Sequence, residues 1–179
     1  IRDHTSGEVA CEHIKYWKQD VDLMAQIGLQ AYRFSISWSR ILPNGFGEIN
    51  QEGIDFYDRL IDALLEKNIV PFVTLFHWDL PEVLEKQGGW LNPEIAKWFG
   101  EYSGILSKRF SDRVSNWFTL NEPQCFIGLG YYSGTKAPGL KLSTKECLRA
   151  LHHSLLAHGY SVRALRENAK KPIKVGPVN

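Results

Sequence analysis

The sequence alternates between segments with helical periodicity and segments with strand periodicity, and this order restricts the possible folds more than any other feature. Apolar residues recur every three to four positions in the first kind of segment, which predicts amphipathic helices over residues 9–27, 51–67, 92–110 and 144–169. The second kind is rich in aromatic and β-branched residues, which predicts strands over residues 31–41, 69–76, 114–120 and 173–179. A repeated helix–strand order favours a parallel sheet with right-handed crossovers.

Several residues mark where these elements should start or end. Gly28 is placed to end the first helix, because glycine readily adopts the left-handed conformation of a C-cap. Asn92 and Pro93 precede the third helical stripe, and they are predicted to be its N-cap and its first helical residue. Residues 124–142 are rich in glycine and tyrosine and are predicted to form a long loop.

A doubly wound open sheet and a (β/α)8 TIM barrel both accommodate this order. A nucleotide-binding open sheet normally carries a glycine-rich phosphate loop after its first strand, and neither GxGxxG nor GxxxxGK[ST] follows any of the predicted strands. Polar side chains instead gather within or just after three strands, at Arg33, Ser35, Ser37, His77, Asp79, Asn121 and Glu122. Functional groups at the carboxyl ends of several strands indicate a barrel.

The length of the chain is short for such a barrel. A complete TIM barrel needs roughly 250 residues and eight strands, whereas these 179 residues contain about four strands. Neither a repeat nor a linker rich in proline, glycine or serine divides the sequence. We therefore expect an α/β chain in which residues 1–179 form a single partial domain, about half of a barrel.

Glu122 is the strongest candidate for a chemical role. It lies in the segment Trp117–Pro123, where an apolar strand pattern ends on an amide, a carboxylate and a proline. A strand that presents a carboxylate at its carboxyl end is how a barrel enzyme positions a general acid/base. In isolation, an Asn-Glu-Pro segment would more simply be a turn with a solvated glutamate, so the other motifs have to decide.

The overall charge argues against two kinds of partner. The chain has 21 basic and 20 acidic residues, for a net charge of +1, and nucleic-acid-binding or acidic-membrane-binding proteins usually have a clustered basic excess. No apolar run approaches the roughly 20 residues of a membrane helix, and no secretory leader is visible. We expect a soluble protein, for which the cytoplasm is one compatible compartment, but Ile1 need not be the natural start.

The cysteines and histidines do not form a metal motif. Cys11, Cys125 and Cys147 are odd in number, widely spaced and without CxxC pairing. A helix carries His152, His153 and His158, and we interpret them as helix-packing residues rather than metal ligands. No metal and no cofactor is therefore predicted.

The motifs together resemble glycoside hydrolase family 1, of the β-glucosidase type. Three segments carry most of the resemblance, namely Tyr32–Ile41, Val73–Pro81 and Thr119–Pro123. Further similarity lies in Asp20–Gly28, Gly88–Trp90, Ala137–Gly139 and Ala150–His158. The resemblance covers effectively the whole chain in the right order, and it implies that the predicted strands are roughly strands 2 to 5 of the family's TIM barrel.

The resemblance also implies a role for five residues. Glu122 matches the general acid/base of a retaining glycosidase, and Asn121 matches the residue that hydrogen-bonds the 2-hydroxyl of the sugar. His77 matches a hydroxyl-binding histidine, and Trp78 is its neighbour in the same substrate-binding subsite. Arg33 matches the arginine that holds and orients the catalytic nucleophile.

Simpler interpretations of these residues stay open at this point. His77 could be a core histidine that binds backbone carbonyl groups, and Arg33 could belong to a structural ion pair, since a buried arginine requires an anionic partner. The tryptophans outside the subsite are predicted to be packing residues rather than sugar platforms, and they are Trp38, Trp90 and Trp117.

Two parts of the family pattern are missing. The family's nucleophile lies in a Thr-Glu-Asn-Gly segment, which does not occur in these 179 residues, and the first barrel strand with its sugar-binding glutamine is also absent. A retaining glycosidase needs two carboxyl groups about 5 to 5.5 Å apart. The chain by itself is therefore expected to be inactive, and we expect either a complementary C-terminal half-barrel or self-association to cover its open sheet edges.

Three functional hypotheses follow. The first is the N-terminal portion of a retaining β-glycosidase that hydrolyses terminal β-D-glycosides, with a β-glucoside or oligosaccharide as substrate; the thioglucoside-cleaving branch has Gln where Glu122 stands. The second is an inactive half-barrel that acts only as a carbohydrate-binding, scaffolding or complementation piece. The third is another barrel glycosidase family with a strand ending in Asn-Glu-Pro, against which the segments around Arg33 and His77 argue.

Overall fold

The computed structural model describes residues 9–179 and contains one four-stranded sheet. Its strands are all parallel and neighbour one another in chain order, β1-β2-β3-β4. The strands are β1 (Ala31–Ser35), β2 (Val70–Phe76), β3 (Asn116–Asn121) and β4 (Lys174–Val178). The parallel sheet predicted from the alternating pattern is confirmed.

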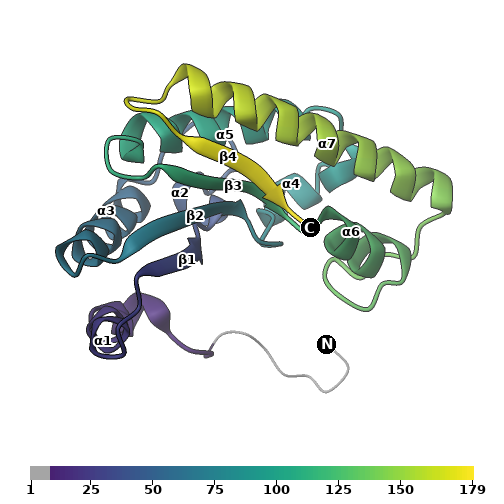
Figure 1. Cartoon of the computed structure of the whole chain (residues 1–179). Coiled ribbons are helices and arrows are strands. Elements are labelled where there is room, and N and C mark those ends of the chain that lie inside the picture. The colour runs from purple at the N-terminus through teal and green to yellow at the C-terminus, as the bar shows by residue number, and fades with distance from the viewer. Residues whose placement is uncertain (1–8) are drawn as a thin grey trace.

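Helices precede and connect the strands. The long ones are α1 (His13–Gln26), α3 (Gln51–Glu66), α5 (Ile95–Phe110) and α7 (Thr144–Glu167). The short ones are α2 (Trp38–Ile41), α4 (Glu82–Glu85), α6 (Pro123–Cys125), the 3-10 turn η1 (Gly89–Leu91) and the wide π-type turn η2 (Phe126–Tyr132). Helices α5 and α7 pack against each other on one side of the sheet, and the carboxyl end of β4 lies beside α6 (Figure 1).

The first helix ends as the sequence predicts. Gly28 has a φ of 77°, its N–H donates to Ala25, and the N–H of Leu29 donates to the carbonyl of Met24. These two bonds form a Schellman motif, which a residue with a Cβ atom would disfavour. The predicted apolar stripe is only partly buried, since Trp17 and Val21 are buried while Ile14 and Ile27 are exposed.

Three predicted boundaries are wrong. The first strand ends at Ser35 rather than residue 41, because the N–H of Ser37 donates to the Tyr57 hydroxyl and its carbonyl begins α2. Helix α5 begins at Ile95, because Asn92 caps a preceding turn by accepting from the N–H of Glu94. Residues 124–142 are not all loop, since α6 and η2 bring Phe126 against Trp90 at a ring distance of 5.1 Å.

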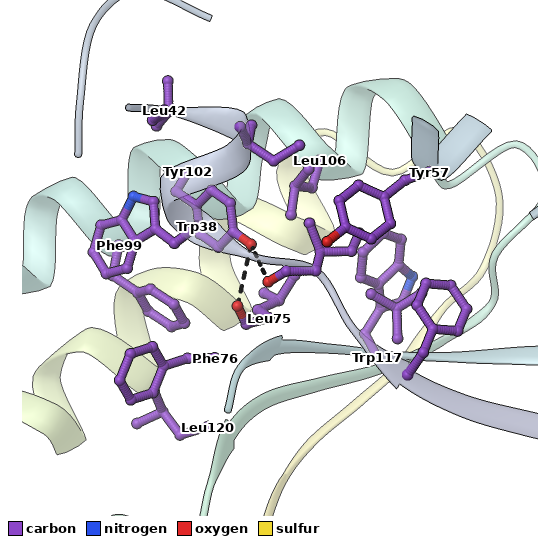
Figure 2. Packing of buried hydrophobic residues seen from close by; sticks show 14 of the residues in the cluster. Trp38, Leu42, Tyr57, Leu75, Phe76, Phe99, Tyr102, Leu106, Trp117 and Leu120 are labelled. Atoms are coloured by element: carbon purple, nitrogen blue, oxygen red, sulfur yellow. Dashed lines mark hydrogen bonds between the residues drawn. The ribbon is translucent and has the colours of Figure 1, made fainter. Parts of the chain in front are cut away.

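The hydrophobic core lies between the sheet and its helices. Its largest fully buried side chains include Trp38, Trp90 and Trp117, which confirms that these tryptophans pack in the interior. The Trp38 ring stacks on Tyr102 of α5 at 5.2 Å. The Tyr102 hydroxyl donates to two backbone carbonyls, those of Ile36 at 2.9 Å and Leu75 at 3.1 Å. Both bonds are drawn as dashed lines in Figure 2. The core therefore ties α5 to the carboxyl ends of β1 and β2, where the polar residues gather.

Strand β3 contains an irregularity that matters for the site. Phe118 pairs with Gly176 and Asn121 pairs with Val178, so β3 has one residue more than β4 between these pairs. An extra residue of this kind reverses the alternation of side chains beyond it. Thr119 accordingly reaches His158 on α7, with 2.7 Å between Oγ1 and Nδ1, while Asn121 points to the arginine on the opposite face of the sheet.

Candidate active site

Arg33 connects three strands at the carboxyl end of the sheet. Its Nη2 donates to Oδ1 of Asn121 at 2.5 Å, and its Nε donates to Oγ1 of Thr74 at 2.9 Å. The guanidinium also lies over the Phe118 ring, 5.0 Å from its centroid. Arg33 is exposed and makes no ion pair with any residue in 9–179. Within that range the structural ion-pair interpretation has no support.

These contacts determine how the Asn121 amide is oriented. Arginine can only donate hydrogen bonds, so the atom facing Arg33 must be the carbonyl oxygen of the amide. Asn121 is only 3% exposed. Because its Oδ1 is bound to Arg33, its Nδ2 group is the part of the amide that can still donate hydrogen bonds. The arrangement can bind an oxygen acceptor such as a sugar hydroxyl. Thr74, fully buried on β2, is part of this arrangement, and no feature of its apolar strand marks it as such.

Glu122 occupies the junction between β3 and α6. Its backbone is in the left-handed region, with φ 48° and ψ 67°, and Pro123 begins the next helix. The N–H of Glu122 donates to the carbonyl of Val178 at 2.8 Å, and its carbonyl accepts from Cys125. The residue is half-buried. The carboxylate therefore lies at the carboxyl end of a strand, as predicted, on a backbone held from both sides.

His77 and Trp78 follow the end of β2. The Trp78 indole Nε1 donates to the backbone carbonyl of Asn121 at 2.9 Å, and its backbone φ is 86°. Both residues are exposed, and the two rings lie 5.6 Å apart and tilted. The exposure of His77 disfavours a buried core histidine. The structure thus joins Arg33, Asn121, Glu122 and Trp78 by direct bonds or peptide links, with His77 adjacent to Trp78.

An open cavity of about 630 Å³ adjoins these residues. Its lining includes Arg33, Thr74 and His77 from the sheet and its strand ends, together with Met24 of α1 and Ile27, the residue that follows this helix. Asn121, Glu122 and Trp78 lie outside its lining, and Trp78 instead borders a second cavity of about 300 Å³ next to Trp90 and Phe126. The predicted site residues therefore do not line a single closed pocket. Arg33 and His77 border the first cavity, and Trp78 borders the second.

Cys125 is a neighbour that the sequence did not single out for the site. Partial desolvation raises the pKa of its thiol, and a hydrogen bond to the Glu122 side chain raises it further. A raised thiol pKa keeps the sulfur protonated at neutral pH, so Cys125 is a weak nucleophile and a donor toward Glu122. Its proximity follows from α6, because Cys125 lies one helical turn after Glu122.

Two of the three histidines of α7 take part in packing, as predicted, whereas His152 is exposed and the packing interpretation is wrong for it. Nδ1 of His153 lies 2.9 Å from the carbonyl oxygen of Trp90, and Nδ1 of His158 contacts Thr119. Burial lowers the pKa of His158, so its ring favours the neutral form. Across residues 9–179 no group of three His, Cys, Asp or Glu side chains is arranged to hold a metal ion. In the same range no helix is long and apolar enough to cross a membrane.

A parallel α/β sheet that presents an arginine from β1 and an amide and a carboxylate from the end of β3, with β2 between them, agrees with the arrangement of barrel glycosidases, whose functional groups come from several strands at the carboxyl edge. The family model for glycosyl hydrolase family 1 matches residues 1–179. The chain belongs to this family.

Curated relatives and solved structures agree with this assignment. Beta-glucosidase A of Thermotoga maritima is 51% identical over 95% of the chain, and a coniferin beta-glucosidase of Pinus contorta is 48% identical over 96%. A structure of the beta-glucosidase from Thermotoga maritima in complex with glucoimidazole covers 99% of the chain at 50% identity, with a TM-score of 0.95.

The match extends over only part of each relative. The chain spans 38% of the Thermotoga maritima sequence, 36% of the Pinus contorta sequence and 40% of the solved glucoimidazole complex. The prediction of a partial barrel is confirmed by this coverage together with the four parallel strands.

Proposed function

We propose that residues 1–179 form one part of a single barrel domain in a retaining β-glucosidase that hydrolyses terminal β-D-glycosides. The observation that carries this proposal is the bonded arrangement of Arg33, Asn121 and Glu122 at the carboxyl ends of β1 and β3. The beta-glucosidases among the relatives, including one solved with castanospermine, support the same substrate class.

Glu122 acts as the general acid/base in this proposal. It protonates the departing glycosidic oxygen in the first step and then activates water in the second. Asn121 donates from Nδ2 to the 2-hydroxyl oxygen of the sugar, because its Oδ1 is already bound to Arg33. This contact strengthens as positive charge develops on the sugar ring in the transition state.

The remaining residues bind substrate and orient the nucleophile. His77 offers ring nitrogens to the sugar hydroxyls, and Trp78 presents its ring in the same subsite. Arg33 uses Nε and Nη2 within the site, and its Nη1 has no partner within residues 9–179. In this proposal, that group holds the nucleophilic carboxylate. Retaining hydrolysis requires a second carboxyl about 5 to 5.5 Å from the first and no cofactor.

The second carboxyl is proposed to come from a complementary half-barrel. The edges of β1 and β4 carry no further strand within residues 9–179, and unpaired edges and apolar helix faces favour association. Exposed apolar side chains on α7 include Leu148, Leu155 and Tyr160. We expect the complementary half to cover this helix and to close the sheet.

The test is Glu122→Gln in an active polypeptide that contains these residues. We expect hydrolysis of an alkyl β-glucoside to fall by about 10²- to 10⁴-fold, because its leaving group needs the proton. Circular dichroism and melting temperature should stay nearly unchanged. The matched control is Glu82→Gln, which alters an exposed pair with Lys86 on α4 and should leave turnover unchanged. Unchanged turnover in Glu122→Gln would contradict the acid/base assignment.

One observation favours a second candidate function. The sequence contains no Thr-Glu-Asn-Gly segment, so residues 1–179 by themselves could bind a carbohydrate without cleaving it. Calorimetry with glucoimidazole distinguishes the two functions. Saturable binding by the chain with no hydrolysis of any aryl glucoside, even after the complementary half is added, would favour the binding function.

A further inference from the structure

The indole N–H of Trp78 is already engaged by the protein. It donates to the backbone carbonyl of Asn121 at 2.9 Å, and this carbonyl belongs to the peptide group that links Asn121 to Glu122. Indole has one N–H and no other hydrogen-bonding group. Trp78 therefore has no polar group left for a sugar hydroxyl, and it can contact substrate only through the face of its ring.

The same peptide group is held from its other side as well. The N–H of Glu122 donates to the carbonyl of Val178 on β4 at 2.8 Å. Both polar atoms of one peptide group are thus bound by neighbours from different parts of the sheet edge, Trp78 in the segment after β2 and Val178 in β4. This double attachment fixes the plane of the peptide and hence the direction in which the Glu122 side chain leaves the backbone.

The fixed peptide plane stabilises an unusual backbone conformation at Glu122. Glu122 has φ 48° and ψ 67°, a left-handed conformation that residues with a Cβ atom adopt only when their surroundings enforce it. Without the indole bond, the Asn121 carbonyl could rotate toward solvent and the left-handed turn could relax. The carboxylate would then move away from the glycosidic oxygen that it must protonate.

We propose that Trp78 is a positioning residue, which fixes the Glu122 carboxylate through the Asn121–Glu122 peptide. The inference rests on the proposed function of Glu122 as the acid/base. It predicts a defect confined to proton transfer, because the sugar contacts of Asn121 and His77 do not depend on the indole N–H. A misplaced acid slows glycosides with poor leaving groups and spares those whose leaving group departs without a proton.

The experiment compares two substrates in Trp78→Phe, made in an active polypeptide that contains residues 1–179. One is 2,4-dinitrophenyl β-glucoside, which needs no proton on the leaving group, and the other is phenyl β-glucoside, which does. We expect the initial rate with the phenyl substrate to fall about 10- to 100-fold more than the rate with the dinitrophenyl substrate. Single-turnover measurements isolate the first step.

The chain offers a matched control. Trp38 also donates from Nε1 to a backbone carbonyl at 2.9 Å, that of Gly45, but it is fully buried and its carbonyl lies outside the site. Trp38→Phe removes the same kind of bond, so it should change both substrates by the same factor. If Trp78→Phe does not fold, replacing Trp78 by β-(3-benzothienyl)alanine removes only the N–H and keeps the ring shape.

The outcomes separate the inference from the proposed function. Equal slowing of both substrates with a raised KM would show that Trp78 binds the sugar, and equal rates in variant and parent would show that the indole bond is dispensable; either result overturns the inference. If the unsubstituted polypeptide hydrolyses neither glucoside, the proposed function fails and the inference fails with it. Slowing of the phenyl substrate alone supports both.

Discussion

Arg33 and Asn121, 88 positions apart in the chain, are joined by a hydrogen bond of 2.5 Å from Nη2 to Oδ1. The bond spans from β1 across β2 to the end of β3. It orients the amide so that Nδ2 is its free group. A residue that could equally accept or donate is thereby turned into a donor.

Asn121→Asp tests this orientation. The substitution keeps an acceptor for Arg33 and strengthens the contact through charge, but it removes both N–H donors. We expect kcat/KM for a β-glucoside to fall by about 10²- to 10³-fold, as when a transition-state donor is lost, with an unchanged or higher melting temperature. Steady-state kinetics and calorimetry provide the measurements.

The control for this variant is Asn116→Asp at the opposite end of β3. It adds the same charge to the same strand far from the carboxyl end, and activity should be retained. Retained activity in Asn121→Asp itself would mean that the amide does not act as a donor to substrate.

Tyr102→Phe should destabilise the fold. Burial raises the pKa of Tyr102 well above its usual range, so the hydroxyl stays protonated and serves the carbonyls of Ile36 and Leu75. Without it, two buried carbonyls lose a donor, and we expect the free energy of unfolding in urea to fall by about 1–3 kcal/mol. Tyr132→Phe, at a residue that is 57% exposed, should change it by less than about 0.5 kcal/mol. Similar values for the two variants would contradict the prediction.

Glu85 should make stability depend on pH. Burial raises its pKa above the ordinary 4.5, although the Tyr131 hydroxyl donates to the carboxylate and lowers it in part. A raised pKa means that the folded state holds the proton more tightly than the unfolded state does. The contribution of Glu85 to the free energy of unfolding is therefore present at low pH and is lost as pH rises through the raised pKa. The free energy of unfolding of Glu85→Gln, relative to the parent, should therefore increase from pH 4 to pH 8.

Glu146→Gln provides a control of opposite sign. Hydrogen bonds from Ser143 lower the pKa of Glu146 in the capping box of α7. The contribution of Glu146 to the free energy of unfolding is therefore present above the ordinary pKa and is lost as pH falls through the lowered pKa. The relative stability of this variant should decrease as pH rises. Parallel pH profiles for the two variants would refute both assignments.

Local pattern was sufficient to predict the elements and the edge of the sheet at which the site lies. Alternating periodicity predicted the four parallel strands, and strand ends in a parallel sheet meet at one edge, so Arg33, His77 and Glu122 had to be near one another. The boundary errors have a common cause. At Ser37 a tertiary contact, the bond to the Tyr57 hydroxyl, overrode a β-branched and aromatic run.

The contacts within the site could not be predicted in this way. The extra residue in β3 turns Thr119 toward α7 and Asn121 toward Arg33, although simple alternation would place both on one face. Thr74 and Trp78 gain their partners only when β1, β2 and β3 are adjacent.

The sequence by itself determined the parallel α/β class, the carboxylate at a strand end and the family to which the chain belongs, because these depend on residue type and spacing. The tertiary structure decided which atoms of Arg33, Asn121 and Trp78 meet, and so which donors remain free. Hydrogen bonds form between atoms within about 3 Å, and side chains that are 41 to 88 positions apart reach that distance only through the register and the bulge of the folded sheet.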